Sequence, residues 1–177
     1  MSQLSCFTAL AALALTTPIL AGNAPTLRPE LEPLNIASGT WLYDGETNSV
    51  ADQKAGKWTW LEECGWSANR AFMTCSFTMN WPDGVVKSQA VSTYNYKDKS
   101  YWHYEMFDSD GSGAHPFISR MTIANNTWTN YGKSDKKTYR VIYHYTSATQ
   151  VSVLIQLTDD NVHWTTMAQG KGVKKSD

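Results

Sequence analysis

The segment WTWLEECGWSANRAFMTCSFTM, residues 58–79, decides the fold that we expect for this chain. It holds two runs of alternating side chains, separated by the turn-forming tip Ser67-Ala68-Asn69. In a β-hairpin, alternation places every second side chain on one face, here Trp58, Trp60, Glu62, Cys64 and Trp66 on the first strand and Met73, Cys75, Phe77 and Met79 on the second. Because this face is almost entirely apolar, we expect it to point into a core.

The rest of the chain repeats this pattern, and a content of 12% aromatic residues also favours strands. We predict strands at 39–45, 57–66, 70–80, 85–97, 100–109, 115–123, 126–132, 137–146, 150–158 and 162–170. Turn formers such as Pro82-Asp83-Gly84 and Asn125-Asn126 lie at the junctions. About ten sequential strands with short connections predict an all-β domain, a single antiparallel up-and-down barrel, because closure removes exposed edges.

Two features precede the first predicted strand. Residues 1–24 contain an apolar run that ends in small residues, which is typical of a signal peptide cleaved after Ala21 or Ala24. We therefore expect a secreted or periplasmic protein with one domain at 25–177 and no stable membrane insertion after cleavage, a retained anchor being the alternative. Pro29-Glu30-Leu31 opens a short helical turn that ends at Ser38-Gly39.

Cysteine usage and charge limit the partners. Cys6 leaves with the signal, and Cys64 and Cys75 form an even pair on facing strands, so a disulfide is expected in an oxidising compartment. The formal net charge of −1, with scattered Lys and Arg, argues against a nucleic-acid partner. The four histidines are dispersed, so we predict no metal and no cofactor, with haem on a single His as a minor alternative. The oligomeric state stays open.

Gly39-Thr40-Trp41, which opens the first strand, resembles the Gly-x-Trp signature of lipocalins, in which the Trp closes one end of the barrel. The chain is also similar to a group of mostly bacterial secreted proteins known only as a domain of unknown function with a lipocalin-like fold. The matching landmarks are residues 39–41, 63–66 with Cys75, 107–111, Tyr139-Arg140-Val141 and the acidic turn before Trp164. This resemblance implies a calycin-type barrel and no particular activity.

The candidate site lies on the predicted inward face. Trp60, Trp66, Phe77 and Tyr143 would form an aromatic wall, and Glu62 would be its polar anchor. A carboxylate among tryptophans has its pKa raised, so Glu62 could act as an acid or base or hold a cationic or hydroxylated ligand. The alternative without a functional role is that Glu62 lies near the barrel mouth, where it is hydrated or paired with an Arg. Arg140 joins this set only if its strand turns its Arg140 and His144 face inward, in place of the likelier tyrosine face.

His103 and Glu105 share one face of the strand predicted at 100–109 and could form an oriented base. We expect that face to be solvated, because Trp102, Tyr104 and Met106 make the opposite face more apolar. The leading hypothesis is a barrel that binds a small apolar or aromatic ligand in its lumen. One rival is a small-molecule enzyme (isomerase, lyase or hydrolase) that uses the buried Glu62 with a His or Arg across the barrel, which requires a titratable pair within hydrogen-bonding reach inside the cavity. The other is a non-catalytic interaction module, which requires an exposed aromatic patch and a filled interior.

Overall fold

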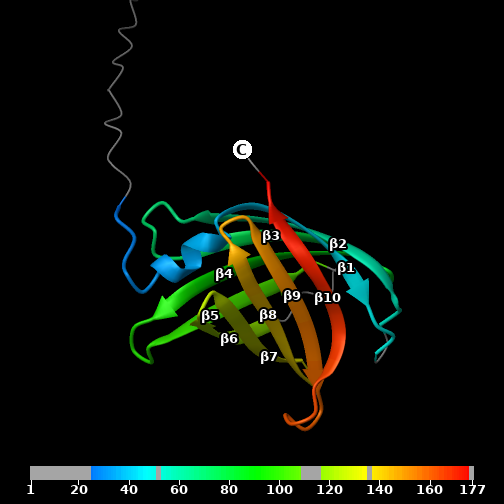
Figure 1. Ribbon diagram of the computed structural model, residues 1–177. Helices are drawn as coiled ribbons and strands as arrows, with labels where there is room; N and C mark the ends of the chain where they lie inside the picture. Colours follow the sequence, from blue (N-terminus) through cyan, green and yellow to red (C-terminus); the bar gives the residue numbers. More distant parts are fainter. Residues whose placement is uncertain (1–24, 51–52, 109–116, 135–136, 176–177) are drawn as a thin grey trace, which may run out of the picture.

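The computed structural model describes residues 25–50, 53–108, 117–134 and 137–175. In these segments the chain forms a closed antiparallel barrel preceded by one 3-10 turn (Figure 1). The elements are η1 (Glu32–Ala37), β1 (Gly39–Thr47), β2 (Gly56–Trp66), β3 (Met73–Trp81), β4 (Gly84–Asn95), β5 (Ser100–Phe107), β6 (Phe117–Ala124), β7 (Thr127–Ser134), β8 (Lys137–Ser147), β9 (Gln150–Thr158) and β10 (Thr165–Lys174). The predicted fold class, including the short N-terminal turn, is confirmed.

The barrel is a meander in which each strand pairs with the next and β1 closes the ring against β10. Alternation along each strand sends one set of side chains into the lumen, as the register of the first hairpin shows: Cys64 faces Cys75 and Glu62 faces Phe77. The predicted signal segment, residues 1–24, lies outside the described residues. Within the described residues, no helix has the length and apolar character needed to cross a bilayer.

Several strand boundaries differ from the prediction by a few residues, and the late starts of β3 and β10 have a cause in the turns beside them. In the β2–β3 turn, the Ser67 hydroxyl accepts hydrogen bonds from the backbone N–H groups of Ala71 and Phe72, so β3 begins at Met73. In the β9–β10 turn, Asp160 accepts from the N–H groups of Val162 and His163, both at 2.8 Å. Since these residues are held in a turn, β10 begins only at Thr165.

One end of the barrel is closed by η1 and by Trp41, whose side chain is fully buried. Trp41 Nε1 donates to the Ala37 carbonyl at 3.1 Å, and Leu31 and Leu34 of this segment are also buried. The Lys174 ammonium lies over the Trp41 indole, with its Nζ 5.6 Å from the ring centroid, which is a cation–π distance. The Trp41 expected from the Gly-x-Trp pattern therefore does close this end, and the basic residue that covers it comes from the end of β10.

The closing seam between β1 and β10 depends on two glycines that face each other, Gly45 and Gly170. The buried ring of Trp58 lies against both of them. A Cβ atom placed at Gly170 would lie 2.6 Å from the Trp58 ring and also too near the Asp44 carbonyl, which is backbone and cannot move freely. Small residues are therefore required where the ring crosses the seam.

Gly170→Ala is expected to lower the free energy of unfolding by about 2 kcal/mol, because the added methyl must push Trp58 and the β1 backbone apart. Equilibrium urea unfolding measures this loss. Gly65→Ala is the matched control, since a Cβ atom at Gly65 in β2 meets nothing within 4 Å. An equal loss in both variants would show that the seam is not the cause.

Candidate functional site

The lumen contains a cavity of about 590 Å³ at the end of the barrel opposite η1. Asp83 and Gly84 of the β3–β4 turn contribute to its lining at that end, and the deeper lining comes from the middle of the strands. This volume lies within the range of roughly 300–1,000 Å³ found for small-molecule sites. The lumen is therefore hollow rather than packed solid.

One side of the cavity is aromatic and aliphatic. Trp60, Phe77 and Tyr143 line it, and Phe77 and Tyr143 each contact Trp60 at a steep angle, so we call these three residues the aromatic box. The Trp60 ring lies 5.6 Å from Phe77 at 66° and 6.1 Å from Tyr143 at 71°. Tyr43 stacks behind Trp60 at 5.0 Å. Such edge-to-face packing holds the box in one shape.

The side formed by β4 to β7 carries polar groups of the lining, His103, Glu105 and Asn130, among apolar residues. His103 Nε2 lies 3.6 Å from Glu105 Oε2, and both side chains line the cavity. The neighbouring strand orients them, because Ser88 donates to Glu105 and the Ser92 hydroxyl lies 2.9 Å from His103 Nδ1. Since Ser88 and Ser92 are small, they leave the lumen open above them. The structure thus places a titratable pair inside the cavity, but its 3.6 Å separation exceeds hydrogen-bond distance, so the condition set for the enzyme alternative is met only in part.

Glu62 is buried, with only 6% of its surface exposed. Its removal from water raises the pKa of the carboxyl from 4.5 to about 7; the nearby Tyr43 hydroxyl lowers it in part and the charge of Glu105 raises it further. Tyr43 Oη and Glu62 Oε2 nevertheless have no hydrogen-bond partner among the described residues. Burial, and then the charge of Glu62, raise the pKa of Tyr43 and Tyr143 well above 10, so these phenols stay neutral.

A second, deeper cavity of about 20 Å³ adjoins Glu62. It is lined by residues that also line the main cavity, including Phe77, Tyr143, His103 and Asn130. Asn130 Oδ1 has no hydrogen-bond partner among the described residues. A volume of this size is large enough for one water molecule between polar groups. The unpartnered carboxyl therefore lies just beyond the floor of the main cavity.

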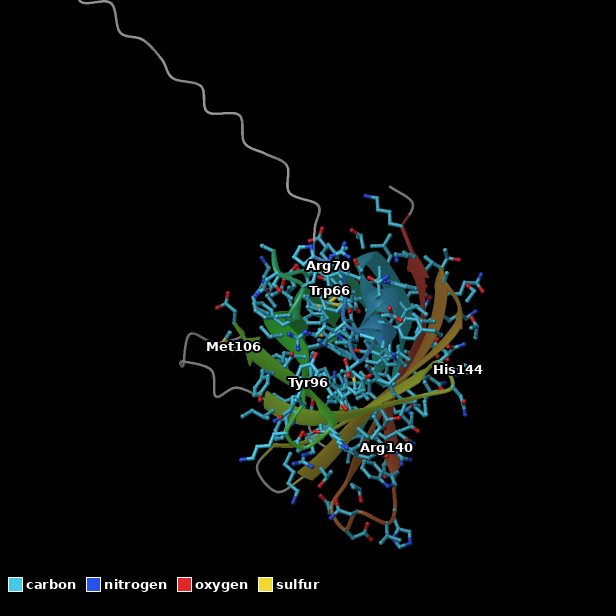
Figure 2. The ribbon with its side chains drawn as sticks, turned by 90° about the vertical axis from the view of Figure 1, so that its left-hand side faces the viewer. Trp66, Arg70, Tyr96, Met106, Arg140 and His144 are labelled. Carbon is cyan, nitrogen blue, oxygen red and sulfur yellow. A yellow bond between two sulfur atoms is a disulfide. The ribbon has the colours of Figure 1, made fainter. Side chains whose placement is uncertain are left out.

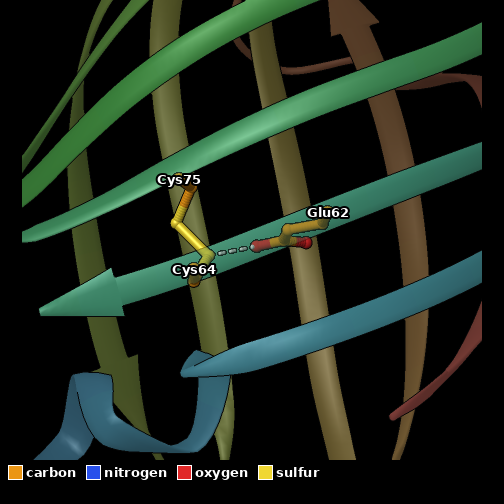
Figure 3. Close-up of side chains that lie close together, drawn as sticks. All are labelled: Glu62, Cys64 and Cys75. Atoms are coloured by element: carbon orange, nitrogen blue, oxygen red, sulfur yellow. Dashed lines mark hydrogen bonds between the residues drawn. A yellow bond between two sulfur atoms is a disulfide. The ribbon is translucent and has the colours of Figure 1, made fainter. Parts of the chain in front are cut away.

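The predicted disulfide is confirmed: Cys64 and Cys75 are bonded across β2 and β3 with a Cα–Cα distance of 4.1 Å. Glu62 Oε1 lies 3.2 Å from the Cys64 sulfur (Figure 3). A disulfide sulfur carries no hydrogen and can only accept, so this contact is a hydrogen bond only when Glu62 is protonated. Although these three residues lie close together, the bonded sulfurs are not thiolates and do not form a metal site.

The other predicted site residues lie at different places. Trp66 lies at the closed end, beside η1, where its Nε1 donates to Asn35 at 2.9 Å (Figure 2). Arg140 lies on the outer side of β8: its Nε donates to Gln156 at 2.7 Å, and its guanidinium covers the Trp164 ring at 4.0 Å. This corrects the inclusion of Arg140 among the lumen residues, because its neighbours Tyr139 and Val141 take the inward positions.

The predicted orientation of β5 is wrong, since His103 and Glu105 face the lumen and Trp102, Tyr104 and Met106 face outward. The outer aromatics have their own partners there. Trp102 stacks on Tyr104, donates to Asp98 and lies under the Arg120 guanidinium. Apolarity therefore fails to identify the inner face of this strand. The useful signal was the run of small residues Ser88, Ala90 and Ser92 on β4, which leaves room for larger polar partners opposite.

Sequence reasoning also missed Ile155 and Met167, which complete the cavity beside Val141 of the predicted inward tyrosine face. His144 is exposed on the outer face with Arg140, as expected when the tyrosine face of its strand points inward, and His163 is also exposed. His115 lies outside the described residues. The outer aromatics of β5 continue to Ile118 and Tyr131 on the next strands, both exposed. An aromatic outer surface is thus present, but the interior is hollow, which separates this barrel from the interaction-module alternative.

The fold and the lumen together define a ten-stranded barrel of the lipocalin-like, calycin type. The chain is similar to the crystal structure of Rv2717c from M. tuberculosis, with a TM-score of 0.60, 10% identity, and coverage of 85% of this chain and 100% of that one. It is also similar to the S-type phycobiliprotein lyase CPES from Guillardia theta, with a TM-score of 0.58, 10% identity, and coverage of 82% of this chain and 92% of that one.

At 10% identity these likenesses extend to the fold alone. No protein-family model matches the chain, and no curated protein matches it either. Membership of the secreted family of unknown function therefore stays a prediction. The closed barrel and the Cys64–Cys75 disulfide are observed in the structure and do not depend on that membership.

Proposed function

We propose that this protein binds a small, largely apolar or aromatic molecule in the lumen of its barrel. The observation that carries the proposal is the 590 Å³ cavity with an aromatic box on one side and oriented polar groups on the other. Small-molecule sites combine mostly apolar walls with a few placed polar groups in this way. The box would hold the apolar body, and His103, Glu105 and Glu62 would fix its orientation.

The proposal includes a site of action outside the cytoplasm. It is supported by the signal-like residues 1–24 and by the Cys64–Cys75 disulfide, since disulfides persist in oxidising compartments. Native mass spectrometry of protein purified from its own secreted or periplasmic fraction tests both parts at once. The expected mass is that of a chain starting after Ala21 or Ala24, with a small molecule attached.

Val141→Trp is expected to weaken binding of the co-purified molecule by more than tenfold, because the added ring occupies the cavity. Titration followed by isothermal calorimetry measures the affinity. Ile142→Trp is the matched control, since Ile142 is the next residue on the same strand and points to the other face. Equal affinity in the two variants would place the ligand outside the lumen.

An enzyme is the second candidate, favoured by the 3.6 Å contact between His103 and Glu105 inside the cavity. A positioned histidine with a carboxylate neighbour can transfer protons to a bound substrate. The two functions differ in what the protein releases. A binder returns its molecule unchanged after incubation, whereas an enzyme converts it and loses that conversion in His103→Gln.

A further inference from the structure

The lumen combines carboxyl groups with an absence of long basic side chains. Among the described residues that line the two cavities, Asp83, Glu105 and Glu62 are acidic, and none is Lys or Arg. His103 is the single basic side chain in this set, and it is already engaged by Ser92 and Glu105. Asp83 contacts the Lys54 ammonium at the rim and Glu105 lies beside His103, so among the described residues Glu62 is the lumen carboxyl without a basic partner.

Glu62 is the least compensated of these groups. It is more than nine-tenths buried, its Oε2 has no hydrogen-bond partner among the described residues, and it borders the deeper cavity. A buried carboxylate without a positive partner is costly, so proteins rarely keep one without a reason. In the empty lumen protonation relieves this cost, and a cationic ligand would relieve it by supplying the positive charge.

The aromatic box is suited to supply the rest of a cation site. Phe77 and Tyr143 each meet the Trp60 ring edge-on, at 66° and 71°, with centroid separations of 5.6 and 6.1 Å. The face of an aromatic ring attracts cationic groups within about 6 Å, and boxes of several rings select quaternary ammonium groups. Phe77 and Tyr143 line both cavities, so the main cavity, which the aromatic box borders, lies next to the small cavity that the Glu62 carboxyl borders.

We propose that the ligand of this lumen is an organic cation, an amine with an apolar body whose charged nitrogen packs against the aromatic box and is balanced by Glu62 and Glu105. The inference rests on the proposed function and deepens it, because it names the chemical class that the lumen selects. An anionic ligand is disfavoured, since it would meet carboxyl groups and no Lys or Arg in the described lining.

The test uses an isosteric pair of probes, benzyltrimethylammonium and its neutral carbon analogue neopentylbenzene, titrated into the mature protein with tryptophan fluorescence as the readout. The cation is expected to bind at least about tenfold more tightly, which corresponds to about 1.4 kcal/mol. Benzylammonium, which can donate hydrogen bonds, is titrated alongside. If benzylammonium binds more tightly than benzyltrimethylammonium, the lumen selects a protonated amine. If it binds more weakly, the lumen selects a quaternary ammonium group.

Variants locate the source of the preference. Glu62→Gln and Glu105→Gln should each reduce the preference for the cation several-fold and leave neopentylbenzene binding unchanged, which also shows that the lumen is intact. Glu63→Gln is the matched control, because Glu63 is the next residue on β2, carries the same charge and is exposed on the outer face. It should leave all affinities unchanged.

The outcomes separate the two proposals. If neopentylbenzene binds as tightly as the cation, or if the preference survives in both lumen variants, the cation inference is overturned and the apolar ligand-binding function stands. If neither probe binds, both proposals fail together. A preference lost equally in Glu63→Gln would show that the net charge of the protein, and not the lumen, attracts the cation, and would overturn the inference.

Discussion

Glu62→Gln is expected to gain stability relative to the unsubstituted protein as the pH rises from about 4 to about 8, by roughly 3 kcal/mol in total. Burial raises the pKa of the Glu62 carboxyl from 4.5 to about 7. Below pH 4.5 the carboxyl is protonated in both the folded and the unfolded protein and contributes no difference. Between pH 4.5 and 7 the unfolded chain loses the proton more readily, so folding becomes less favourable, and Gln avoids this loss.

Urea unfolding of both proteins at the two pH values measures the effect. At each pH the free energy of unfolding of the unsubstituted protein is subtracted from that of Glu62→Gln, which removes the contribution of all other titrating groups. Glu63→Gln removes an exposed carboxyl from the same strand and should follow the unsubstituted protein at both pH values. A stability difference between Glu62→Gln and the unsubstituted protein that is independent of pH would show that Glu62 is not held as a neutral acid.

Trp41→Ala is expected to lower the free energy of unfolding by about 4 kcal/mol, because it removes the largest fully buried side chain at the closed end of the barrel. The ring contacts Tyr145 edge-on at 5.6 Å, donates to Ala37 and lies under Lys174. Its loss would free η1 from the barrel as well as open a cavity. Urea unfolding with the disulfide intact measures the change.

Trp102→Ala provides the comparison for Trp41, since Trp102 is a tryptophan that lies on the outer face of β5. We expect a loss of about 1 kcal/mol or less, because its ring is only partly buried and its contacts with Tyr104 and Arg120 lie at the surface. Equal losses for the two tryptophans would contradict the role of Trp41 as the plug of the barrel.

The hairpin at residues 58–79 shows why so much of the fold could be predicted. Its alternation is regular over two long strands, its turn is marked by polar residues, and the two cysteines set its register. The β6–β7 turn is equally local, since Asn125 and Asn126 adopt positive φ values of 48° and 58°, which asparagine tolerates in tight hairpin turns. Because such signals lie within a few residues of one another, each hairpin can be predicted from the sequence, and the order of the strands and the closure of the barrel follow from the series of hairpins.

The candidate site was only partly predictable. Trp60, Phe77, Tyr143 and Glu62 were correctly placed in the barrel interior, because one face of each strand was clearly the more apolar. The same criterion failed for His103 and Glu105, because the inner face of β5 carries the polar groups of the site and its outer face is aromatic. Hydrophobic patterning identifies a packed core, whereas a ligand site is an exception to it.

Local patterns along the chain were sufficient to predict the class of fold, the approximate strands, the disulfide partners and the inward position of the first hairpin, because these depend on period-two alternation and turn chemistry within a few residues. Packing across the closed barrel was needed to establish which face of β5 enters the lumen, that Arg140 lies outside, that Lys174 covers Trp41, and that a 590 Å³ space remains open. These features depend on how side chains from strands distant in sequence fill the lumen. That volume is a property of the closed barrel and is not encoded in any one strand.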